Sequence, residues 1–321
     1  MKIIFLGTPD FAIPSLDKIL SSKHELLAVI TQIDKPSGRG NKLTESPVKI
    51  WAKNHGIKVL QYEKISRDGL EEIKNLAPDL MITAAYGQIL SQSIIDIPKY
   101  GIINVHASLL PKYRGAAPIQ AAIMNGETYT GVTIMQTEAG LDTGDILSVG
   151  KTTIGEEETA GELSHRLSEM GAELLMMTIE DIEHGTIVPE KQQHTNATIT
   201  TKIKKEDCLI NWNKSSKEIK CLILGTSPDP MARTSLNGEL VKIARAREDN
   251  SIQPDDDTKI GEILALSSAK AGVFVKCGQG VIEILEAQFP GGKILSGKQL
   301  FAGRKLKVGD VFNTIVYLEN N

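Results

Sequence analysis

Short runs of apolar and β-branched residues recur through the first half of the chain, and helix-length segments separate them. The runs lack strict apolar–polar alternation, which is typical of strands buried on both faces of a parallel sheet. Apolar positions close to helical period predict a long helix over Thr159–Glu183, which Gly185 is placed to end. The sequence therefore predicts a doubly wound α/β domain with strands at Lys2–Leu6, Leu26–Thr31, Lys58–Gln61, Asp79–Ala84, Gly101–His106, Gly131–Gln136 and Ile146–Val149.

The pattern changes in the second half. From about Gly185 to Lys205 it is dominated by Thr, Gln, Asn and Lys, which predicts a linker over residues 186–205. Short strands between Gly, Asn and Asp turns then favour a small β-barrel, for which the OB type is one candidate. We expect a first domain at 1–185, a barrel at 206–313 and a tail at 314–321. The expected barrel elements are strands at Leu209–Trp212, Val241–Arg245, Gly272–Cys277 and Val281–Ala287 and a helix at Ser216–Leu224.

Composition excludes several classes and reveals a charge asymmetry. With 321 residues, 41% hydrophobic and 24% charged, the chain fits two ordinary globular domains rather than a disordered, collagen-like or disulfide-scaffold protein. Residues 1–190 carry 17 basic and 25 acidic side chains, a net charge of −8, whereas residues 191–321 carry 19 and 15, a net charge of +4. The basic half hints at a polyanionic partner, although ordinary variation in surface charge explains the split equally well at this stage.

The sequence also predicts the compartment. No run of 18 apolar residues predicts a membrane span, and the apolar run at the start is too short for a signal peptide. Cys208, Cys221 and Cys277 form no CxxC pair and lack histidines at zinc-finger spacing. We therefore expect a cytoplasmic protein with reduced cysteines and no metal.

Two loops bear on the choice of ligand. The turn after the first strand contains Gly7 and Pro9 where the dinucleotide fingerprint needs three glycines, and the chain has no GxxxxGK[ST] motif. Nicotinamide, flavin and P-loop nucleotide chemistry are therefore disfavoured. The 14 residues of Asp34–Pro47 lack periodicity and include the cations Lys35, Arg39 and Lys42. A loop of this length in a compact domain is either functional or a mobile surface insertion.

Polar residues gather after the fifth predicted strand. Asn104 and His106 are two apart, so both point to one face at its carboxyl end, where open α/β sheets bind ligands. Asp142 follows the next strand in a Gly-bounded loop. An amide to stabilise an oxyanion, an imidazole to move protons and a carboxylate to fix its tautomer suit transfer of an acyl group to an amine. From spacing alone, each can equally be an ordinary hydrogen-bonded polar residue.

The kind of acyl transfer is also indicated. No Cys lies near these residues, and Ser108 lacks the G-x-S-x-G elbow of a serine nucleophile. Direct attack by the amine is therefore favoured over a covalent acyl-enzyme.

Several segments carry a family resemblance: Asn104–Pro111, Arg114–Gln120, Gly131–Met135 and Gly140–Asp145. They resemble the formyltransferase family that uses 10-formyltetrahydrofolate. The resemblance begins at Phe5–Ala12, includes Gly38–Gly40 and Ser46–Lys49, reaches Lys305–Asp310, and excludes only the tail after about Phe312. The Asn/His/Asp motif is shared across the family, whereas the Asp34–Pro47 loop, the RGAAPIQ segment and the second domain resemble the branch that formylates methionine on initiator tRNA.

The resemblance implies a Rossmann-like formyltransferase domain joined to an OB-like barrel. It implies 10-formyltetrahydrofolate as formyl donor, initiator Met-tRNA as acceptor, no metal and no membrane, and we expect a monomer. Asn104, His106 and Asp142 would be the catalytic residues. The folate site would be lined by Ser108, Leu109, Leu110 and Pro111. The residues expected to contact tRNA are Arg39, Lys42, Lys202, Lys204, Lys205, Arg304, Lys305 and Lys307.

One departure from the family pattern and three alternatives stay open. Asp229 and Arg233 stand where members usually carry aromatic residues, which puts a contact of the barrel in doubt. Within the same chemistry, glycinamide ribonucleotide and amino sugar nucleotides are rival acceptors. A purine enzyme should end near the first domain, and the loop around Arg39 is the feature that argues against a sugar nucleotide. A noncatalytic tRNA-binding protein would have no need of a buried His–Asp pair.

Overall fold

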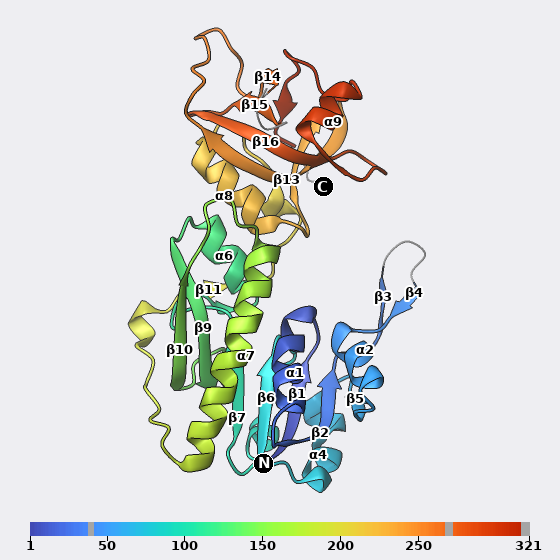
Figure 1. Ribbon diagram of the computed structural model, residues 1–321, viewed down its shortest axis with the longest axis vertical. Helices are drawn as coiled ribbons and strands as arrows, with labels where there is room; N and C mark the ends of the chain where they lie inside the picture. Colours follow the sequence, from blue (N-terminus) through green and yellow to red (C-terminus); the bar gives the residue numbers. More distant parts are fainter. Residues whose placement is uncertain (38–41, 267–271, 316–321) are drawn as a thin grey trace, which may run out of the picture. The chain divides into compact units, whose positions relative to one another are not determined.

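The computed structural model describes residues 1–37, 42–266 and 272–315, and they fold into two compact units (Figure 1). The first unit contains Met1–Pro118, Thr130–Thr152 and Ser164–Thr200. The second contains Ile119–Tyr129, Thr153–Leu163 and the chain from Thr201 onward. The predicted boundaries at 185 and 206 stay predictions, although the segment just before Thr200 groups with the first unit.

A seven-stranded sheet forms the centre of the first unit, in the order β10-β9-β7-β6-β1-β2-β5. Its central strands pair in parallel, as predicted, whereas β9 runs antiparallel to β7. The sequence could not distinguish the two directions, because a strand buried on both faces has the same apolar pattern in either. The strands are β1 (Lys2–Gly7), β2 (Glu25–Thr31), β5 (Val59–Gln61), β6 (Leu80–Ala84), β7 (Ile102–His106), β9 (Tyr129–Gln136) and β10 (Ile146–Thr153).

Helices flank this sheet. The long α7 (Ala160–His184) confirms the predicted helix and ends before Gly185, whose φ of +69° suits glycine. At Gly171 a Cβ would lie 2.9 Å from the Val105 side chain, so glycine permits close packing on β7. The other helices of the first unit are η1 (Asp10–Ala12), α1 (Ile13–Leu20), α2 (Pro47–Asn54), α3 (Ile65–Asp68), α4 (Leu70–Leu76), α5 (Gln92–Ile95) and η2 (His194–Asn196).

Two short sheets lie outside the main one. β3 (Lys35–Ser37) and β4 (Lys42–Thr44) pair antiparallel within the Asp34–Pro47 loop, for which the sequence predicted no strand. Arg39, between them, lies outside the described residues. β11 (Ile199–Thr200) pairs in parallel with β8 (Arg114–Gly115). The β11 pairing shows that part of the segment predicted as a linker is hydrogen-bonded to the first unit.

The second unit is built on an antiparallel sheet in the order β14-β15-β16-β13-β12-β18, with β17 paired to β16. Hydrogen bonds from Gly309 to Ile263 and from Phe312 to Gly261 join its two ends, so the sheet curls into a small barrel as predicted. Its core includes Trp212, stacked on Phe312 at 5.4 Å. The strands are β12 (Ala232–Leu236), β13 (Glu239–Asp249), β14 (Ile263–Leu266), β15 (Val273–Lys276), β16 (Val281–Gln288), β17 (Ile294–Ser296) and β18 (Phe312–Asn313).

The helices of the second unit are α6 (Pro118–Met124), which belongs to it from Ile119 onward, η3 (Glu206–Cys208), α8 (Ser216–Thr226) and α9 (Gly297–Ala302). α8 confirms the predicted helix and begins with a capping box between Ser215 and Glu218. The predicted strand at Leu209–Trp212 is wrong: only Leu209 forms an isolated bridge, to Arg233. Its apolar residues instead fill the barrel core, where Ile210 and Trp212 are buried.

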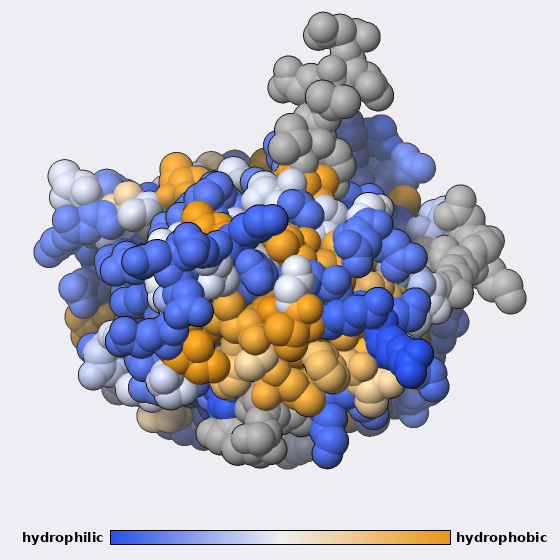
Figure 2. Space-filling view, turned by 90° about the horizontal axis from the view of Figure 1, so that it is seen from above, coloured by the Kyte–Doolittle hydropathy of each residue, from blue (hydrophilic) through white to orange (hydrophobic). Residues whose placement is uncertain are grey.

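Figure 2 shows polar and apolar residues together on one face of the molecule. The face shown in Figure 2 carries hydrophilic residues around an apolar area near its centre. Partly exposed apolar side chains such as Ile260, Ile294 and Val308 belong to the second unit. Exposed apolar residues of this kind are common on globular proteins.

Candidate active site

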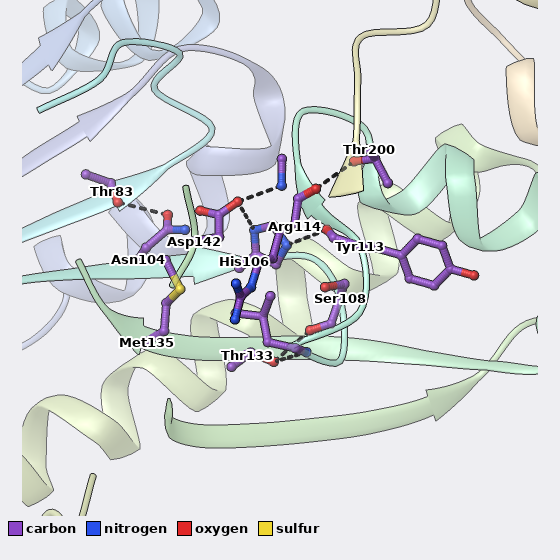
Figure 3. Close-up of polar contacts among 12 residues, drawn as sticks. Thr83, Asn104, His106, Ser108, Tyr113, Arg114, Thr133, Met135, Asp142 and Thr200 are labelled. Carbon is purple, nitrogen blue, oxygen red and sulfur yellow. Dashed lines mark hydrogen bonds and ion pairs between the residues drawn. The ribbon is translucent and has the colours of Figure 1, made fainter. Parts of the chain in front are cut away.

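Asn104 is oriented by the neighbouring strand. Thr83 on β6 pairs with Asn104 on β7, and its Oγ1 donates a 2.8 Å hydrogen bond to Asn104 Oδ1. The carboxamide oxygen is thereby occupied, and within the described residues the Asn104 amide nitrogen makes no hydrogen bond. Figure 3 shows that nitrogen on the side of His106 and Asp142. Asn104 is therefore placed to act as a hydrogen-bond donor there.

His106 is almost fully buried at the carboxyl end of β7, with 5% of its surface exposed. Its Nε2 lies 2.9 Å from the carbonyl oxygen of Tyr113. A carbonyl only accepts hydrogen bonds, so this contact assigns the ring proton to Nε2 in the neutral imidazole. Nδ1 then carries the lone pair, and it lies 3.6 Å from Asp142 Oδ2. Uptake of a proton at Nδ1 would create an imidazolium beside a carboxylate.

Asp142 reaches the imidazole from the loop between β9 and β10. Its φ is +49°, in the left-handed region that Asp enters more readily than most residues. Its Oδ2 accepts a 2.7 Å hydrogen bond from the backbone N–H of Gly115. The structure thus brings together Asn104, His106 and Asp142, as the spacing of the sequence suggested (Figure 3).

The residues predicted to line a folate site form a tight turn after β7. Ser108 is fully buried and its hydroxyl donates to the Lys112 carbonyl at 2.7 Å, so it shapes the turn rather than offering a polar group to a ligand. Leu110 and Pro111 are joined by a cis peptide bond, and Leu110 is buried. Leu109 and Pro111 are half-buried and remain the members of this set with accessible surface.

Thr133 on β9 holds this turn, a role that the sequence did not reveal. Its Oγ1 donates to the Ser108 carbonyl at 2.7 Å and accepts from the Leu110 N–H at 3.2 Å. Thr133 pairs with His106 across the antiparallel β7–β9 ladder, so the same strand that flanks the imidazole fixes the turn beyond it.

A second missed contribution comes from the segment after α7. Thr198 accepts a hydrogen bond from the Tyr113 N–H at 2.8 Å through its side chain, and its carbonyl accepts from the Arg114 N–H at 2.9 Å. Thr200 donates to the Arg114 carbonyl at 3.2 Å. These bonds fix the stretch whose Tyr113 carbonyl contacts His106. The alternating threonines were the only signal in the sequence for this pairing.

Gln192 in the same segment is buried and uses all of its amide. Its Oε1 accepts from Arg114 Nε at 3.1 Å and from Arg114 Nη2 at 2.6 Å. Its Nε2 donates to the carbonyls of Asp142 at 2.9 Å and Gly144 at 2.7 Å. Gln192 and Arg114 are 5% and 6% exposed, so this connection lies inside the first unit.

The residues predicted to bind tRNA are placed only in part. Arg39 lies outside the described residues, and Lys42 is the first residue of β4. The remaining six are all exposed and belong to the second unit: Lys202, Lys204, Lys205, Arg304, Lys305 and Lys307. Their contacts with tRNA stay predictions.

The base of the β3–β4 hairpin is fixed by an ion-pair network. Lys49 Nζ lies 2.6 Å from Asp34 Oδ2, just before β3, and 3.3 Å from Glu45 Oε1, just after β4. Gln61 donates to Asp34 Oδ1 at 2.9 Å. The hydrogen bond from Lys49 holds the pKa of Asp34 below its usual range. Both ends of the hairpin are therefore tied to α2, which begins at a Ser46 cap.

Three further observations concern the chain away from this site. Cys208, Cys221 and Cys277 are buried free thiols, and burial raises the pKa of Cys208 to about 11 and of Cys277 to about 12. Over the described part of the chain, no cluster of three or more His, Cys, Asp or Glu side chains could hold a metal ion. In those same ranges no helix is long and apolar enough to cross a membrane.

Comparison with known families defines the class of this protein. Residues 1–179 match the family described as formyl transferase, and residues 202–305 match the formyl transferase C-terminal domain. The first match covers more than half of the chain, so the chain belongs to the formyl transferase family.

Within this family, the chain is similar over nearly its whole length to proteins named methionyl-tRNA formyltransferase. The methionyl-tRNA formyltransferase of Alkaliphilus metalliredigens is 46% identical over 310 residues, which cover 96% of this chain and 97% of the relative. The methionyl-tRNA formyltransferase of Geobacter metallireducens is 44% identical over 310 residues, with 96% and 97% covered. The similarity therefore includes both units rather than the first alone.

Solved structures share the fold at lower identity. HypX from Aquifex aeolicus, crystallised with tetrahydrofolic acid, matches with a TM-score of 0.68 and 17% identity over 96% of this chain and 48% of HypX. The sugar 3N-formyltransferase WlaRD, crystallised with dTDP and 5-N-formyl-tetrahydrofolate, matches with a TM-score of 0.65 and 23% identity over 91% of this chain and 99% of WlaRD. At these identities the likeness establishes the architecture alone.

Proposed function

We propose that this protein transfers the formyl group of 10-formyltetrahydrofolate to the α-amine of methionine on initiator tRNA, by direct attack of the amine. The observation that carries the proposal is the convergence of an amide donor, a buried imidazole of defined tautomer and a fixed carboxylate at one end of the sheet. The full-length similarity to methionyl-tRNA formyltransferases supports the choice of acceptor.

Asn104 supplies the electrostatic part of the reaction. Attack on the formyl carbon places negative charge on the formyl oxygen, and the Asn104 N–H group stabilises that charge. Because Thr83 already occupies the amide oxygen, the N–H is oriented before the substrate arrives. A preoriented donor of this kind lowers a barrier by about 2.7–4 kcal/mol in well-measured acyl-transfer enzymes.

His106 moves the proton. The new bond joins the amine nitrogen to the formyl carbon, and the bond from that carbon to the folate nitrogen breaks. The amine therefore loses one proton and the folate nitrogen gains one. The Nδ1 lone pair of His106 accepts the first proton, and the Asp142 carboxylate 3.6 Å away stabilises the resulting imidazolium until the proton is passed on.

The residues present fit a formyl folate as donor. Bound 10-formyltetrahydrofolate supplies an activated formyl group on nitrogen, whose carbonyl oxygen needs a donor such as the Asn104 amide. The turn of Leu109 and Pro111 offers half-buried apolar surface next to β7, which suits the flat ring of a pterin. The family likeness and the folate bound to HypX support the same donor.

The acceptor is proposed from charge. The exposed cations of the second unit provide surface for phosphates, and the β3–β4 hairpin with Arg39 provides a further cation on the first unit. Phosphate contacts by Lys and Arg give tRNA affinity that falls with salt. We propose that the protein acts in the cytoplasm on charged initiator tRNA.

The test is a competition among acceptors. Purified protein is given 10-formyltetrahydrofolate labelled in the formyl group, together with initiator Met-tRNA, free methionine, an amino sugar nucleotide or glycinamide ribonucleotide. Label on the aminoacyl-tRNA alone is the expected result. Label on either nucleotide would overturn the proposed acceptor, and label on none would overturn formyl transfer.

A further inference from the structure

Asp142 lies in the loop between β9 and β10. Residues 138–141 of this loop are exposed, and Asp142 has a left-handed backbone that side chains rarely adopt. At Gly144 a Cβ would lie 1.8 Å from the Gln136 carbonyl oxygen, so the loop folds tightly against the end of β9. The position of the Asp142 carboxylate therefore depends on what holds the backbone at 142 and 144.

Gln192 holds the backbone of Asp142 and Gly144 through hydrogen bonds. Its Nε2 donates to the Asp142 and Gly144 carbonyls, while its Oε1 accepts two bonds from the Arg114 guanidinium. Both side chains are more than nine-tenths buried, so water cannot easily replace these bonds. Removing the amide would take this partner from Arg114 Nε and from the Asp142 and Gly144 carbonyls in the interior, although Arg114 Nη2 would keep its 3.1 Å contact with His194 Nδ1.

The residues on either side of Arg114 contact His106 and Asp142, so they link the Gln192–Arg114 hydrogen bonds to the imidazole. The Tyr113 carbonyl contacts His106 Nε2, and the Gly115 N–H donates to Asp142 Oδ2. The residue between them, Arg114, is the one that Gln192 binds. Asp142 is thus held at its carboxylate by Gly115 and at its carbonyl by Gln192. Because Gln192 also binds Arg114, the residue before Gly115, both contacts depend on the stretch of residues 113–115.

We propose that Gln192 is a positioning residue for formyl transfer, which fixes the Asp142 loop so that the carboxylate faces His106. The inference rests on the proposed catalytic role of Asp142. The chemistry of the site requires an amide: a carboxylate at 192 would bind Arg114 but could not donate to two carbonyls, and an ammonium could donate but could not accept. A shift of about 1 Å in a catalytic group is enough to cost about 10²-fold in rate.

The first experiment measures kcat and KM for Gln192→Met, which keeps the side-chain length but removes the hydrogen bonds. We expect kcat to fall roughly 10- to 100-fold, with KM for the folate and for Met-tRNA within about twofold of wild type. Gln192→Glu should not rescue kcat. The matched control is Gln193→Met, because Gln193 is the exposed next residue; it should keep wild-type kcat. Wild-type kcat in Gln192→Met would overturn the proposal.

A double-mutant cycle with Asp142→Ala separates the inference from the proposed function. If Gln192 acts through Asp142, Gln192→Met should slow the Asp142→Ala enzyme by less than about twofold. An undiminished loss in that background would show a general structural role and overturn the inference. Full activity of Asp142→Ala itself would instead overturn the proposed mechanism. Arg114→Lys removes the paired hydrogen bonds to Gln192 from the side of the guanidinium, so it should show the same coupling to Asp142→Ala. It replaces Gln192→Met in the cycle if that variant does not fold.

Discussion

The backbone N–H of Gly115 donates a 2.7 Å hydrogen bond to the carboxylate of Asp142, although the two residues are 27 positions apart. The carboxylate is therefore oriented by the protein before any substrate is bound. Gly115 has a φ of +105°, and a Cβ there would lie 2.3 Å from the Thr200 carbonyl oxygen. Both the backbone conformation and the approach of β11 require glycine at this position.

Gly115→Ala should consequently damage the site. The methyl group collides with β11 and turns the N–H away from Asp142, so we expect kcat to fall at least about 10-fold, as for a displaced catalytic group. The control is Gly185→Ala, which has a φ of +69° but no neighbour within 4 Å of a Cβ. It should cost about 1–2 kcal/mol of stability with unchanged kcat. Steady-state kinetics and urea unfolding of both variants check this, and equal kcat losses would contradict it.

His106→Ala should lose formylation activity while its affinity for Met-tRNA stays unchanged. Without the imidazole the attacking amine has no proton acceptor, so we expect kcat to fall about 10²–10⁴-fold. Affinity for Met-tRNA, measured by filter binding, should stay within about twofold, because phosphate contacts dominate tRNA binding. His165→Ala removes an exposed histidine on α7 and is the matched control. A parallel loss of tRNA affinity in His106→Ala would argue against a catalytic role.

Thr83 should matter through the orientation of Asn104. Thr83→Val keeps the shape of the side chain but removes the donor that occupies Asn104 Oδ1. The amide can then turn its oxygen toward the site, and we expect kcat to fall about 10-fold with little change in KM. Thr83→Ser retains the hydroxyl and should recover most of the rate. If Val and Ser variants are equally active, the orientation of Asn104 does not depend on this bond.

Much of this site could be read from the sequence because its parts lie on regular elements. Asn104 and His106 share a face since side chains alternate along a strand, and Asp142 follows the adjacent strand. Gln192 could not be found in this way, because it lies 50 positions from Asp142 in a segment without periodicity. Gln192 reaches Arg114 and Asp142 because its segment continues into β11, which pairs with β8. Such a tertiary contact cannot be predicted from the local sequence pattern.

The second unit shows the same limit. The sequence predicted α8 and strands that overlap β15 and β16. It missed β12, although Asn237 and Gly238 both have positive φ and form the hairpin turn that joins β12 to β13. Leu209–Trp212 has the composition of a strand, but its residues fill the core without a ladder partner. Burial and strand pairing favour the same residue types, and only the structure separates them.

The hairpin base should make stability depend on pH. Lys49 lowers the pKa of Asp34 in the folded state, so the ionised form is favoured there. This contribution is fully present above the ordinary Asp pKa of about 3.9 and is lost as the pH falls through the lowered folded-state value. Asp34→Asn should therefore be less stable than wild type at pH 7, and the difference in free energy of unfolding should shrink toward pH 3. Exposed Asp256→Asn is the control; a difference that persists unchanged at pH 3 would contradict the assignment.

The exposed cations of the second unit should appear in the salt dependence of tRNA binding. Lys202, Lys204 and Lys205 lie within four consecutive residues and are all exposed. If each neutralises a phosphate, replacing all three by Ala should reduce the slope of log affinity against log salt by about 2–3, since each contact contributes roughly 0.7–0.9. A matched loss of three charges at Lys2, Lys74 and Lys99, near the amino ends of the strands of the first unit, should leave the slope unchanged. An equal change in both triple variants would mean that net charge alone attracts the tRNA; a change only in the first would assign the contacts to these lysines.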